Sequence, residues 1–280
     1  MRRNVNGSKP KPESKFRYIN KKAILILLAV IVAVIVVIAV VSNVATKQKF
    51  EASFVETRDT IRIGLRTDIA GFGGIGADGQ ITGFDKDYID MLFAELLGEK
   101  AKLYEYIPTT SQDAAGSIKY GEIDIAMGLM TPDVDKTKGF LLTKPYYTDD
   151  VVVVVKGDSR LDKLSNMDGG KLGILSNAIP IGQLEDYLKS NGMEYEVLRY
   201  SDYESAKIDL TNGTVNAMVM PNAIAKQFAG FRILAEPLYQ VGYSIMLPTG
   251  QAAVESEFNK IVDQFEKDGT TDGLKAKWGL

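Results

Sequence analysis

Short apolar runs and helical patterns alternate along the chain from about residue 60 to its end. The segments 61–65 ("IRIGL") and 171–175 ("KLGIL") have the composition of strands, and the five valines at 151–155 predict a strand buried on both faces. An alternation of strands and helices is typical of parallel sheets built from βαβ units. The pattern therefore predicts an α/β fold.

Apolar residues at helical spacing predict two longer helices. The first begins at about Asp85 and ends at Gly98, and the second lies in the C-terminal stretch and ends at Gly269. Their apolar positions are Tyr88, Met91, Leu92, Leu96 and Leu97 in the first, and Val254, Phe258, Ile261, Val262 and Phe265 in the second. Before the first helix, Asp78-Gly79 is a turn signal that predicts a hairpin.

One helix–strand pattern occurs twice. The segment "SIKYGEIDIAMGLM" (117–130) is echoed by "DLTNGTVNAMVMPN" (209–222), and in each copy a glycine and then a β-branched residue separate a helix-like stretch from an apolar strand. Two such halves indicate two similar lobes, and the space between two lobes is a common ligand site. The alternative explanation is a chance similarity between two glycine-capped turns.

An uncharged apolar run of 19 residues lies near the N-terminus at 23–41. At ~1.5 Å rise per residue, a helix of this length nearly crosses a hydrocarbon core of ~30 Å. Eight basic residues precede the run and only Glu13 opposes them, so the positive-inside rule predicts a cytoplasmic tail at 1–22 and an extracellular domain after Val41. The expected protein is a single-pass protein of the cell membrane, with 42–57 as a linker.

A cleaved signal peptide is the rival explanation of this apolar run. The apolar region of a signal peptide usually has about 7–15 residues and ends in a small-residue cleavage site. The run here is longer, and Ala45 offers only a weak cleavage site. An uncleaved anchor is therefore the preferred interpretation.

Cysteine and histidine are both absent from the 280 residues. Their absence excludes disulfides, lipid attachment through cysteine, thiolate or imidazole metal sites and His-based catalytic triads. We expect neither a metal nor a cofactor. Residues 50–280 carry 23 basic and 35 acidic side chains, a net charge of −12, which gives no electrostatic footprint for nucleic acid.

Three local motifs have simple structural explanations. The segment "GFGGIG" (71–76) matches the G-x-G-x-x-G pattern of dinucleotide loops, but a turn and a short strand follow where such a loop requires a helix. Asp85 and Asp87 lie near a predicted helix start, where carboxylates suit the macrodipole. The pair Asp149-Asp150 is best explained as solvated.

Five segments, in this order, resemble the family 3 extracellular solute-binding proteins, which are the receptors of polar amino-acid ABC importers. They are "IRIGLRTDIAGF", "GQITGFDKDYIDML", "GEIDIAMGLMTPDVDKTK", "KPYYTDDVVVVV" and "KDGTTDGLKAKWGL". None is decisive alone, but their common order and spacing are specific. The resemblance runs from about Ile61 to Leu280, the whole predicted extracellular domain.

The resemblance implies a two-lobed, periplasmic-binding-protein-like α/β fold of type II with two hinge crossovers, here preceded by one transmembrane helix. Lobe 1 is expected at 58–148 and 242–280, and lobe 2 at 149–241. The crossovers are expected near Tyr147 to Val151 and near Leu238 to Tyr243. The implied partners are a small-molecule solute, an ABC permease with its ATPase, and the membrane through the N-terminal helix.

The site implied by the resemblance departs from the family's pattern. Lys136 stands at the family's clamp arginine, and a lysine cannot make the same bidentate contact with a carboxylate. Arg66 stands at an early acid, and Pro221 with Asn222 beside it stands where the family binds an ammonium group. The implied solute is therefore anionic or weakly basic. The expected ligand-binding residues are Arg66, Phe72, Gly128, Thr131, Lys136, Asn177 and Asn222.

A receptor of this kind catalyses no reaction, but three alternatives stay open. The domain can be a sensor that signals through a partner protein, or a degenerate lobe pair that serves as a scaffold. A few relatives of the fold are dehydratases that act on cyclic acids. Such an enzyme needs a placed general acid, and the sequence does not single one out.

Overall fold

The computed structural model describes most of the chain downstream of residue 60 and one helix upstream of it. The described residues are 25–39, 60–69, 71–98, 104–110, 112–131, 137–167, 169–175, 179–200 and 202–280. The helix at 25–39 belongs to a unit separate from the rest, which is compact on its own within residues 46–280.

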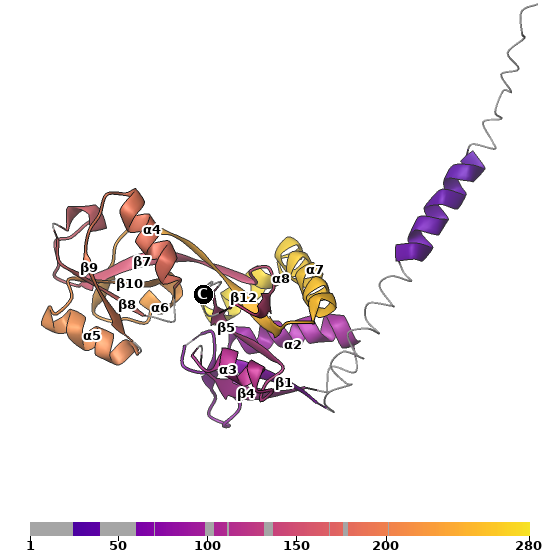
Figure 1. Ribbon diagram of the computed structural model, residues 1–280, viewed down its shortest axis with the longest axis horizontal. Coiled ribbons are helices and arrows are strands. Elements are labelled where there is room, and N and C mark those ends of the chain that lie inside the picture. The colour runs from indigo at the N-terminus through magenta and orange to yellow at the C-terminus, as the bar shows by residue number, and fades with distance from the viewer. Residues whose placement is uncertain are drawn as a thin grey trace, which may run out of the picture. The chain divides into compact units, whose positions relative to one another are not determined.

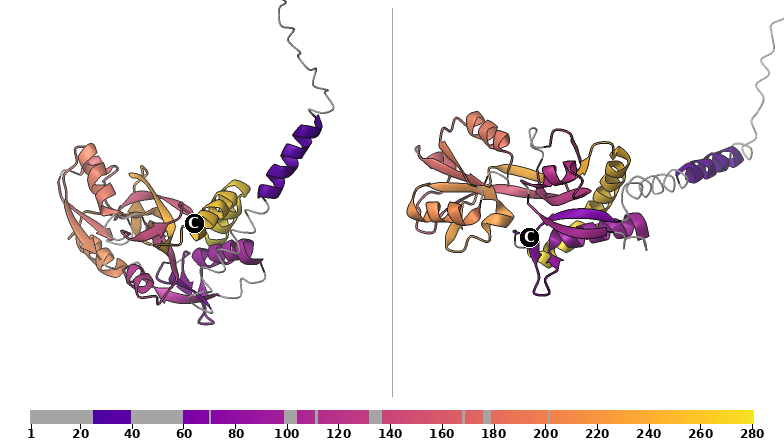
Figure 2. Two further views of the ribbon diagram at one scale, coloured as in Figure 1. Left: turned by 45° about the vertical axis from the view of Figure 1, so that its right-hand side comes forward. Right: turned by 60° about the horizontal axis from the view of Figure 1, so that its bottom comes forward.

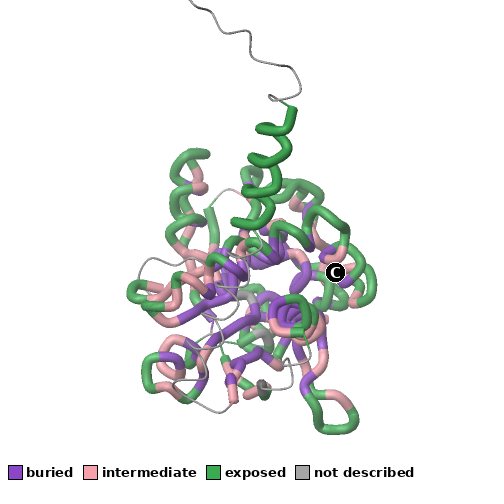
Figure 3. Tube along the Cα trace, turned by 90° about the vertical axis from the view of Figure 1, so that its right-hand side faces the viewer, coloured by how far each residue is buried: buried purple, intermediate pink, exposed green. Residues whose placement is uncertain are grey.

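The helix at 25–39 forms the middle of the predicted transmembrane segment. Its large apolar side chains are all exposed, as the green tube in Figure 3 shows. Among the helices of the described residues, none is both long and apolar enough to cross a membrane. The predicted tail at 1–22, the linker at 42–57 and the two ends of the 23–41 segment lie outside the described residues.

The described elements after residue 60 alternate between strands and helices, as the sequence predicts (Figure 1). The strands are β1 (Ile61–Arg66), β2 (Gly74–Ile75), β3 (Ile81–Thr82), β4 (Tyr104–Thr109), β5 (Ile125–Met130), β6 (Phe140–Leu142), β7 (Tyr147–Lys156), β8 (Lys171–Leu175), β9 (Glu196–Tyr200), β10 (Ala217–Pro221), β11 (Phe231–Ile233) and β12 (Tyr239–Pro248). The helices are α2 (Phe84–Leu97), α3 (Ala114–Lys119), α4 (Ile181–Ser190), α5 (Tyr203–Asn212), α6 (Asn222–Ala225), α7 (Ala252–Asp268) and α8 (Thr270–Trp278), with a short 3-10 turn at Leu164–Asn166.

The strands build two lobes around one continuous ladder. Its order is β4-β1-β5-β12-β7-β10-β8-β9, with β6 beside β12 and β11 beside β7, while β2 and β3 form a separate hairpin. In lobe 1, β1 is parallel to both β4 and β5. In lobe 2, β8 is parallel to both β9 and β10. The views in Figure 2 show the same division of the sheet into two groups of strands.

The long strands β7 and β12 connect the lobes. They pair antiparallel from Tyr239 opposite Val151 to Tyr243 opposite Tyr147. Beyond that stretch, β12 continues beside β5 and β6 in lobe 1, and β7 continues beside β10 and β11 in lobe 2. The five valines of β7 are buried, as predicted. The two predicted crossover segments therefore lie side by side.

The repeated sequence pattern forms the same structure in both lobes. In lobe 1, the Asp124 carboxylate accepts a hydrogen bond from the Arg62 N–H (2.7 Å), and the Asp124 N–H donates to the Arg62 carbonyl (2.7 Å). In lobe 2, the Asn216 side-chain oxygen accepts from the Lys171 N–H (2.9 Å), and the Asn216 N–H donates to the Lys171 carbonyl (2.9 Å). The two copies of the pattern therefore make equivalent hydrogen bonds to the first strand of their own lobe.

The matching positions in the two lobes also share a glycine two residues further along. A Cβ atom on Gly64 in β1 would lie 2.5 Å from Cδ1 of Ile123, and one on Gly173 in β8 would lie 2.0 Å from Sδ of Met218. Both distances are far below a van der Waals contact, so a larger residue at either position would require the side chain of Ile123 or Met218 to move.

Three helices of lobe 1, α2, α7 and α8, pack against one another. α2 contacts both α7 and α8, and α7 contacts α8. The carboxylate of Asp87 accepts hydrogen bonds from Lys277 Nζ (2.6 Å) and Trp278 Nε1 (2.7 Å), which ties the end of the chain to the start of α2. The predicted helices and the predicted hairpin are confirmed, but Met91 is 40% exposed and lies away from the buried face of α2.

Candidate functional site

The carboxyl ends of β1 and β5 place three of the expected ligand-binding residues at one edge of lobe 1. Arg66 is the last residue of β1, Gly128 lies within β5, and Thr131 follows β5 directly. Because β1 and β5 are parallel neighbours, their carboxyl ends share an edge, and ligands of open α/β sheets bind outside that edge. Thr131 is partly exposed, whereas Arg66 and Gly128 are buried.

Arg66 is paired within its own chain. Its Nε donates to Asp68 Oδ1 (2.9 Å) and its Nη2 donates to Asp68 Oδ2 (2.8 Å). The Arg66 side chain is 6% exposed and that of Asp68 is 52% exposed. Burial would raise the pKa of Asp68, but the hydrogen bonds and the charge of Arg66 outweigh it and hold that pKa below its usual value.

This pair changes the expected charge of the site. From the sequence, Arg66 is expected to add a positive charge to the site, but Asp68 balances that charge in the structure. The structure shows a bidentate pair whose acid faces solvent more than its base does. The sequence contains a signal for this pair, because Arg66 and Asp68 carry opposite charges two residues apart at the end of a strand.

Gly128 makes room for Arg66. A Cβ atom on Gly128 would lie 2.8 Å from Cβ and 2.9 Å from Cγ of Arg66. Gly128 also has φ +119°, a conformation that residues with a Cβ rarely adopt. The glycine is therefore required both for its own backbone and for the position of the arginine beside it.

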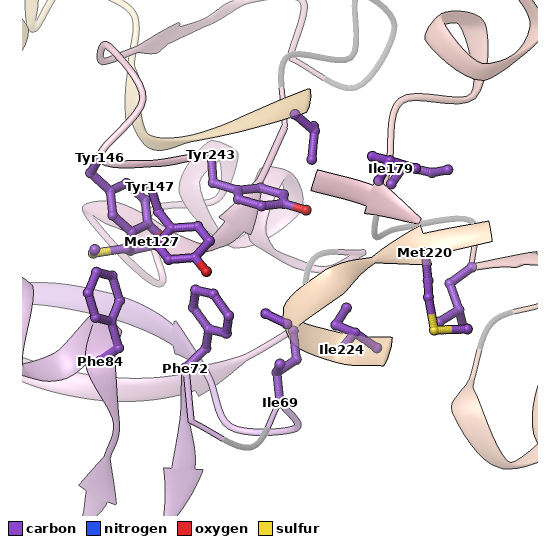
Figure 4. Close-up of a cluster of buried hydrophobic side chains, with 14 of the residues drawn as sticks. Ile69, Phe72, Phe84, Met127, Tyr146, Tyr147, Ile179, Met220, Ile224 and Tyr243 are labelled. Atoms are coloured by element: carbon purple, nitrogen blue, oxygen red, sulfur yellow. The ribbon is translucent and has the colours of Figure 1, made fainter. Parts of the chain in front are cut away.

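Phe72 lies in an aromatic cluster that includes the first residue of β7. Its ring packs edge-on against Tyr147, with 4.7 Å between ring centroids, and against Phe84, with 5.8 Å. Figure 4 shows these rings together with Tyr243. Phe72 is 1% exposed. Its side chain is covered by other aromatic rings, and its contact with a solute stays a prediction.

Asp85, the second residue of α2, is a fully buried carboxyl group beside this aromatic cluster. Its Oδ1 accepts a hydrogen bond from the hydroxyl of Tyr146 (2.9 Å), the residue just before β7. Burial raises the pKa of Asp85 to about 7, although the bond from Tyr146 and the charge of Arg66 oppose that rise. Asp85 therefore lies in the first turn of α2, as expected, but it is buried there.

On the lobe 2 side, Asp149 of β7 holds the start of α6. Its Oδ2 accepts a hydrogen bond from the N–H of Ala223 (2.9 Å). Asp149 is 7% exposed, and burial raises its pKa although the N–H groups of Ala223 and Asp150 oppose that rise. The expectation of a solvated acid at this position is wrong, because α6 covers the side chain. Asn222, the first residue of α6, is partly exposed at the end of β10.

Two of the expected ligand-binding residues, Lys136 and Asn177, lie outside the described residues. Among the rest, the structure brings Arg66 and Gly128 into contact. Phe72 joins a separate aromatic cluster, and Asn222 lies at the corresponding strand end of lobe 2. Within the described ranges, no group of three or more acidic side chains is placed to hold a metal ion.

A cavity of about 610 Å³ lies beside α3 and begins next to the Arg66 loop. Its lining includes Thr67, Thr110, Gly116 and Tyr120. A Cβ atom on Gly116 would meet nothing within 4 Å, so α3 borders open space at this residue. The Tyr120 ring at the rim is 76% exposed. The described lining comes from lobe 1, so this cavity is not itself a space between two lobes.

Curated relatives match most of this chain. The glutamine-binding protein GlnH of a Bacillus subtilis ABC transporter is 24% identical over 229 residues, which cover 80% of this chain and 82% of the relative. The L-cystine-binding protein TcyJ of Escherichia coli is 24% identical over 231 residues, which cover 80% of this chain and 84% of the relative.

Solved structures share the fold. An ancestral arginine-binding protein bound to arginine superposes with a TM-score of 0.63 at 26% identity, over 79% of this chain and 98% of that one. An ancestral amino-acid-binding protein, a precursor of cyclohexadienyl dehydratase, superposes with a TM-score of 0.63 at 23% identity, over 80% and 97%. These matches show a two-lobed, periplasmic-binding-protein-like α/β fold.

The family assignment rests on the same region as the two lobes. The sequence model described as "Bacterial extracellular solute-binding proteins, family 3" matches residues 61–280, from the first residue of β1 to the last residue of the chain. This span contains both copies of the repeated strand–helix–strand unit and both connecting strands. The chain therefore belongs to the bacterial extracellular solute-binding proteins of family 3.

Proposed function

We propose that this protein captures a small amino-acid-like or anionic solute between its lobes and delivers it to an ABC permease with its ATPase. The observation that carries the proposal is the pair of equivalent lobes connected by β7 and β12 in a family 3 chain. The names of relatives support an amino-acid-like solute, since they refer to glutamine, arginine and cystine. No reaction is proposed, because the two buried carboxyl groups with raised pKa values are covered by other side chains and helices.

We place the solute against the carboxyl ends of the parallel strands in both lobes. Arg66 and Lys136 would attract a carboxylate, and Thr131 with the N–H groups near Gly128 would hydrogen-bond it. The exposed carboxylate of Asp68 adds a partner for an ammonium group, which the sequence interpretation lacked. Phe72, Asn177 and Asn222 remain proposed contacts.

We propose that solute binding closes the lobes about β7 and β12. In this proposal the lobes comprise 58–148 with 242–280 and 149–241, and the paired stretch from Tyr147 to Val151 bends. Two extended strands that share a few hydrogen bonds form a hinge that moves without breaking either core. The radius of gyration from small-angle scattering should then fall when a solute binds.

We also propose that residues 23–41 anchor the protein in the cell membrane, with the domain outside. The support is the length and lack of charge of the segment and the eight basic residues before it. Protease added to intact cells should digest the domain after Val41. Protection of that domain until the cells are lysed would contradict the orientation.

The binding proposal is tested by thermal unfolding of the full-length chain in detergent with L-glutamine, L-arginine, L-cystine and succinate. A solute at 100 times its dissociation constant should stabilise the domain by ~2.7 kcal/mol. The Lys136→Met variant should weaken binding of a carboxylate solute by ~1.5–3 kcal/mol, the scale of a hydrogen bond to a charged group. Lys138→Met, two residues further along, is the matched control and should have no effect.

Two outcomes would contradict this proposal. If none of the four solutes stabilises the protein at any concentration, capture of amino-acid-like solutes is wrong. If a solute binds but Lys136→Met and Lys138→Met behave alike, Lys136 does not take the place of the clamp arginine.

A further inference from the structure

A buried carboxyl group, Asp85 in the first turn of α2, has no role in the proposed function beyond its place at a helix start. Asp85 is 0% exposed, and its Oδ2 has no hydrogen-bond partner among the described residues. A buried carboxylate oxygen without a partner is costly, and a stable core usually avoids it. Asp85 is therefore a candidate for a functional rather than a structural role.

The groups that face Asp85 connect the solute site to the hinge. The Tyr146 hydroxyl donates to Oδ1 from the start of β7, and the Asp85 N–H donates to the carbonyl of Phe72 (3.0 Å). A Cβ atom on Gly73 would lie 2.0 Å from the carbonyl oxygen of Arg66, so Arg66 at the end of β1 and Asp85 both touch the Phe72–Gly73 backbone. The charge of Arg66 favours ionisation of Asp85, although burial has the larger and opposite effect on its pKa. Burial and the charges of Asp149 and Asp85 raise the pKa of Tyr147.

The surrounding helices carry charged groups that act on the aromatic neighbours of Asp85 and not on Asp85 itself. From α8, Lys275 Nζ lies 5.1 Å from the centroid of the Tyr147 ring, and from α7, Glu266 acts on Tyr88. Asp149 and Asp150, further along β7, act on Tyr147. Among these described groups, Arg66 is the cation that acts on Asp85 directly.

We propose that Asp85 determines the charge preference of the solute site by acting through Arg66. This inference rests on the proposed solute site at Arg66. When Asp85 is protonated, the pair of Arg66 and Asp68 leaves the described part of the site neutral. When Asp85 is ionised, the same three groups carry one net negative charge, which disfavours an added anion and favours an added cation.

The proposal predicts a specificity that changes with pH. A solute with an extra positive charge binds better when Asp85 is ionised, and by linkage it promotes that ionisation. The pKa of Asp85 is about 7, so the change should occur between pH 6 and pH 8.5. A shift of half to one unit in the pKa of Asp85 on binding corresponds to a change of about three- to tenfold in affinity.

The first experiment needs no solute. The carboxyl carbon of Asp85 is titrated by NMR in the full-length protein, in Arg66→Met and in Arg66→Lys. Because removal of the positive charge removes the interaction that favours ionisation, Arg66→Met should raise the pKa of Asp85 by about half a unit or more. Arg66→Lys retains the charge and should change that pKa less. Equal pKa values in all three proteins would overturn the proposal.

The second experiment measures selectivity by calorimetry with L-glutamine and L-arginine at pH 6 and pH 8.5. These solutes share the same backbone groups, so the ratio of their affinities isolates the side-chain charge. The ratio should move toward L-arginine by about three- to tenfold at the higher pH in the wild type. It should stay constant in Asp85→Asn and should move as in the wild type in Asp90→Asn, the control on the same helix.

The two experiments distinguish a failure of the proposed solute site from a failure of the proposed role of Asp85. If neither amino acid binds at either pH, the proposed amino-acid site is wrong, and the NMR titration alone decides whether Asp85 and Arg66 are coupled. If both bind and the ratio is the same at both pH values in the wild type, Asp85 does not determine selectivity.

Discussion

The hydrogen bonds that repeat in both lobes allow a quantitative test of the duplicated unit. Asp124→Ala removes the carboxylate that accepts the Arg62 N–H (2.7 Å), and Asn216→Ala removes the amide oxygen that accepts the Lys171 N–H (2.9 Å). Each change leaves a strand N–H without its partner. The two variants therefore measure the same contact in two lobes with different chemistry.

The structure predicts unequal costs for the two variants. The bond in lobe 1 is partly buried and its acceptor is a carboxylate that also lies 3.7 Å from Arg62 Nε. A hydrogen bond to a charged group contributes about 1.5–3 kcal/mol, so we expect Asp124→Ala to reduce the free energy of unfolding by that amount. The bond in lobe 2 is exposed and neutral, so water can replace it and Asn216→Ala should cost about 0.5–1.5 kcal/mol.

Urea denaturation of the full-length protein, followed by circular dichroism, gives the midpoint and the slope for each variant. Asp124→Asn is the matched control, because it retains an acceptor of the same shape and loses only the charge. The free energy of unfolding of Asp124→Asn should lie between those of the wild type and Asp124→Ala. A larger loss for Asn216→Ala than for Asp124→Ala, or a loss below about 0.5 kcal/mol for Asp124→Ala, would refute the reasoning.

Three further changes test the packing and the buried charge. Gly128→Ala places a Cβ 2.8 Å from that of Arg66 at φ +119°, so it should cost more than about 1 kcal/mol in urea denaturation and weaken solute binding. Gly173→Ala places a Cβ 2.0 Å from Sδ of Met218 and should cost about 1–3 kcal/mol, with partial relief when Met218→Ala is added. The folded-state pKa of Asp85 is about 7 against an ordinary value of 3.8, so the free energy of unfolding should fall by up to roughly 4 kcal/mol as pH rises from about 4 to 7. Asp85→Asn should lack that fall, and equal pH profiles for the wild type and Asp85→Asn would contradict the assigned pKa.

Local patterns in the sequence were sufficient to predict the main elements. The valines of β7, the hairpin at Asp78-Gly79 and the face of α7 follow from the periods of strands and helices, which are properties of neighbouring residues. The repeated pattern also predicted two similar lobes. Met91 falls at the helical spacing of α2 but is 40% exposed, because that spacing indicates a stripe without its limits, and only the packing of α7 and α8 decides which residues are covered.

Local patterns did not predict which acidic side chains are buried or which partners they bind. Asp87 suited a helix start, yet its carboxylate binds Lys277 and Trp278, which are 190 and 191 residues away. Asp149 was expected in solvent, but the start of α6 covers it and Ala223 donates to it from 74 residues away. Such partners come from distant parts of the chain, so no window of neighbouring residues contains them.

The sequence by itself determined the alternation of strands and helices, the duplicated unit, the apolar N-terminal segment and the family. These features depend on residue order and on backbone preferences that act over a few residues. The tertiary structure decided that Arg66 is balanced by Asp68 and that Asp85 is buried against Tyr146, 61 residues away. The free energy of a charge depends on the groups and the solvent around it, and only the folded chain brings those groups together.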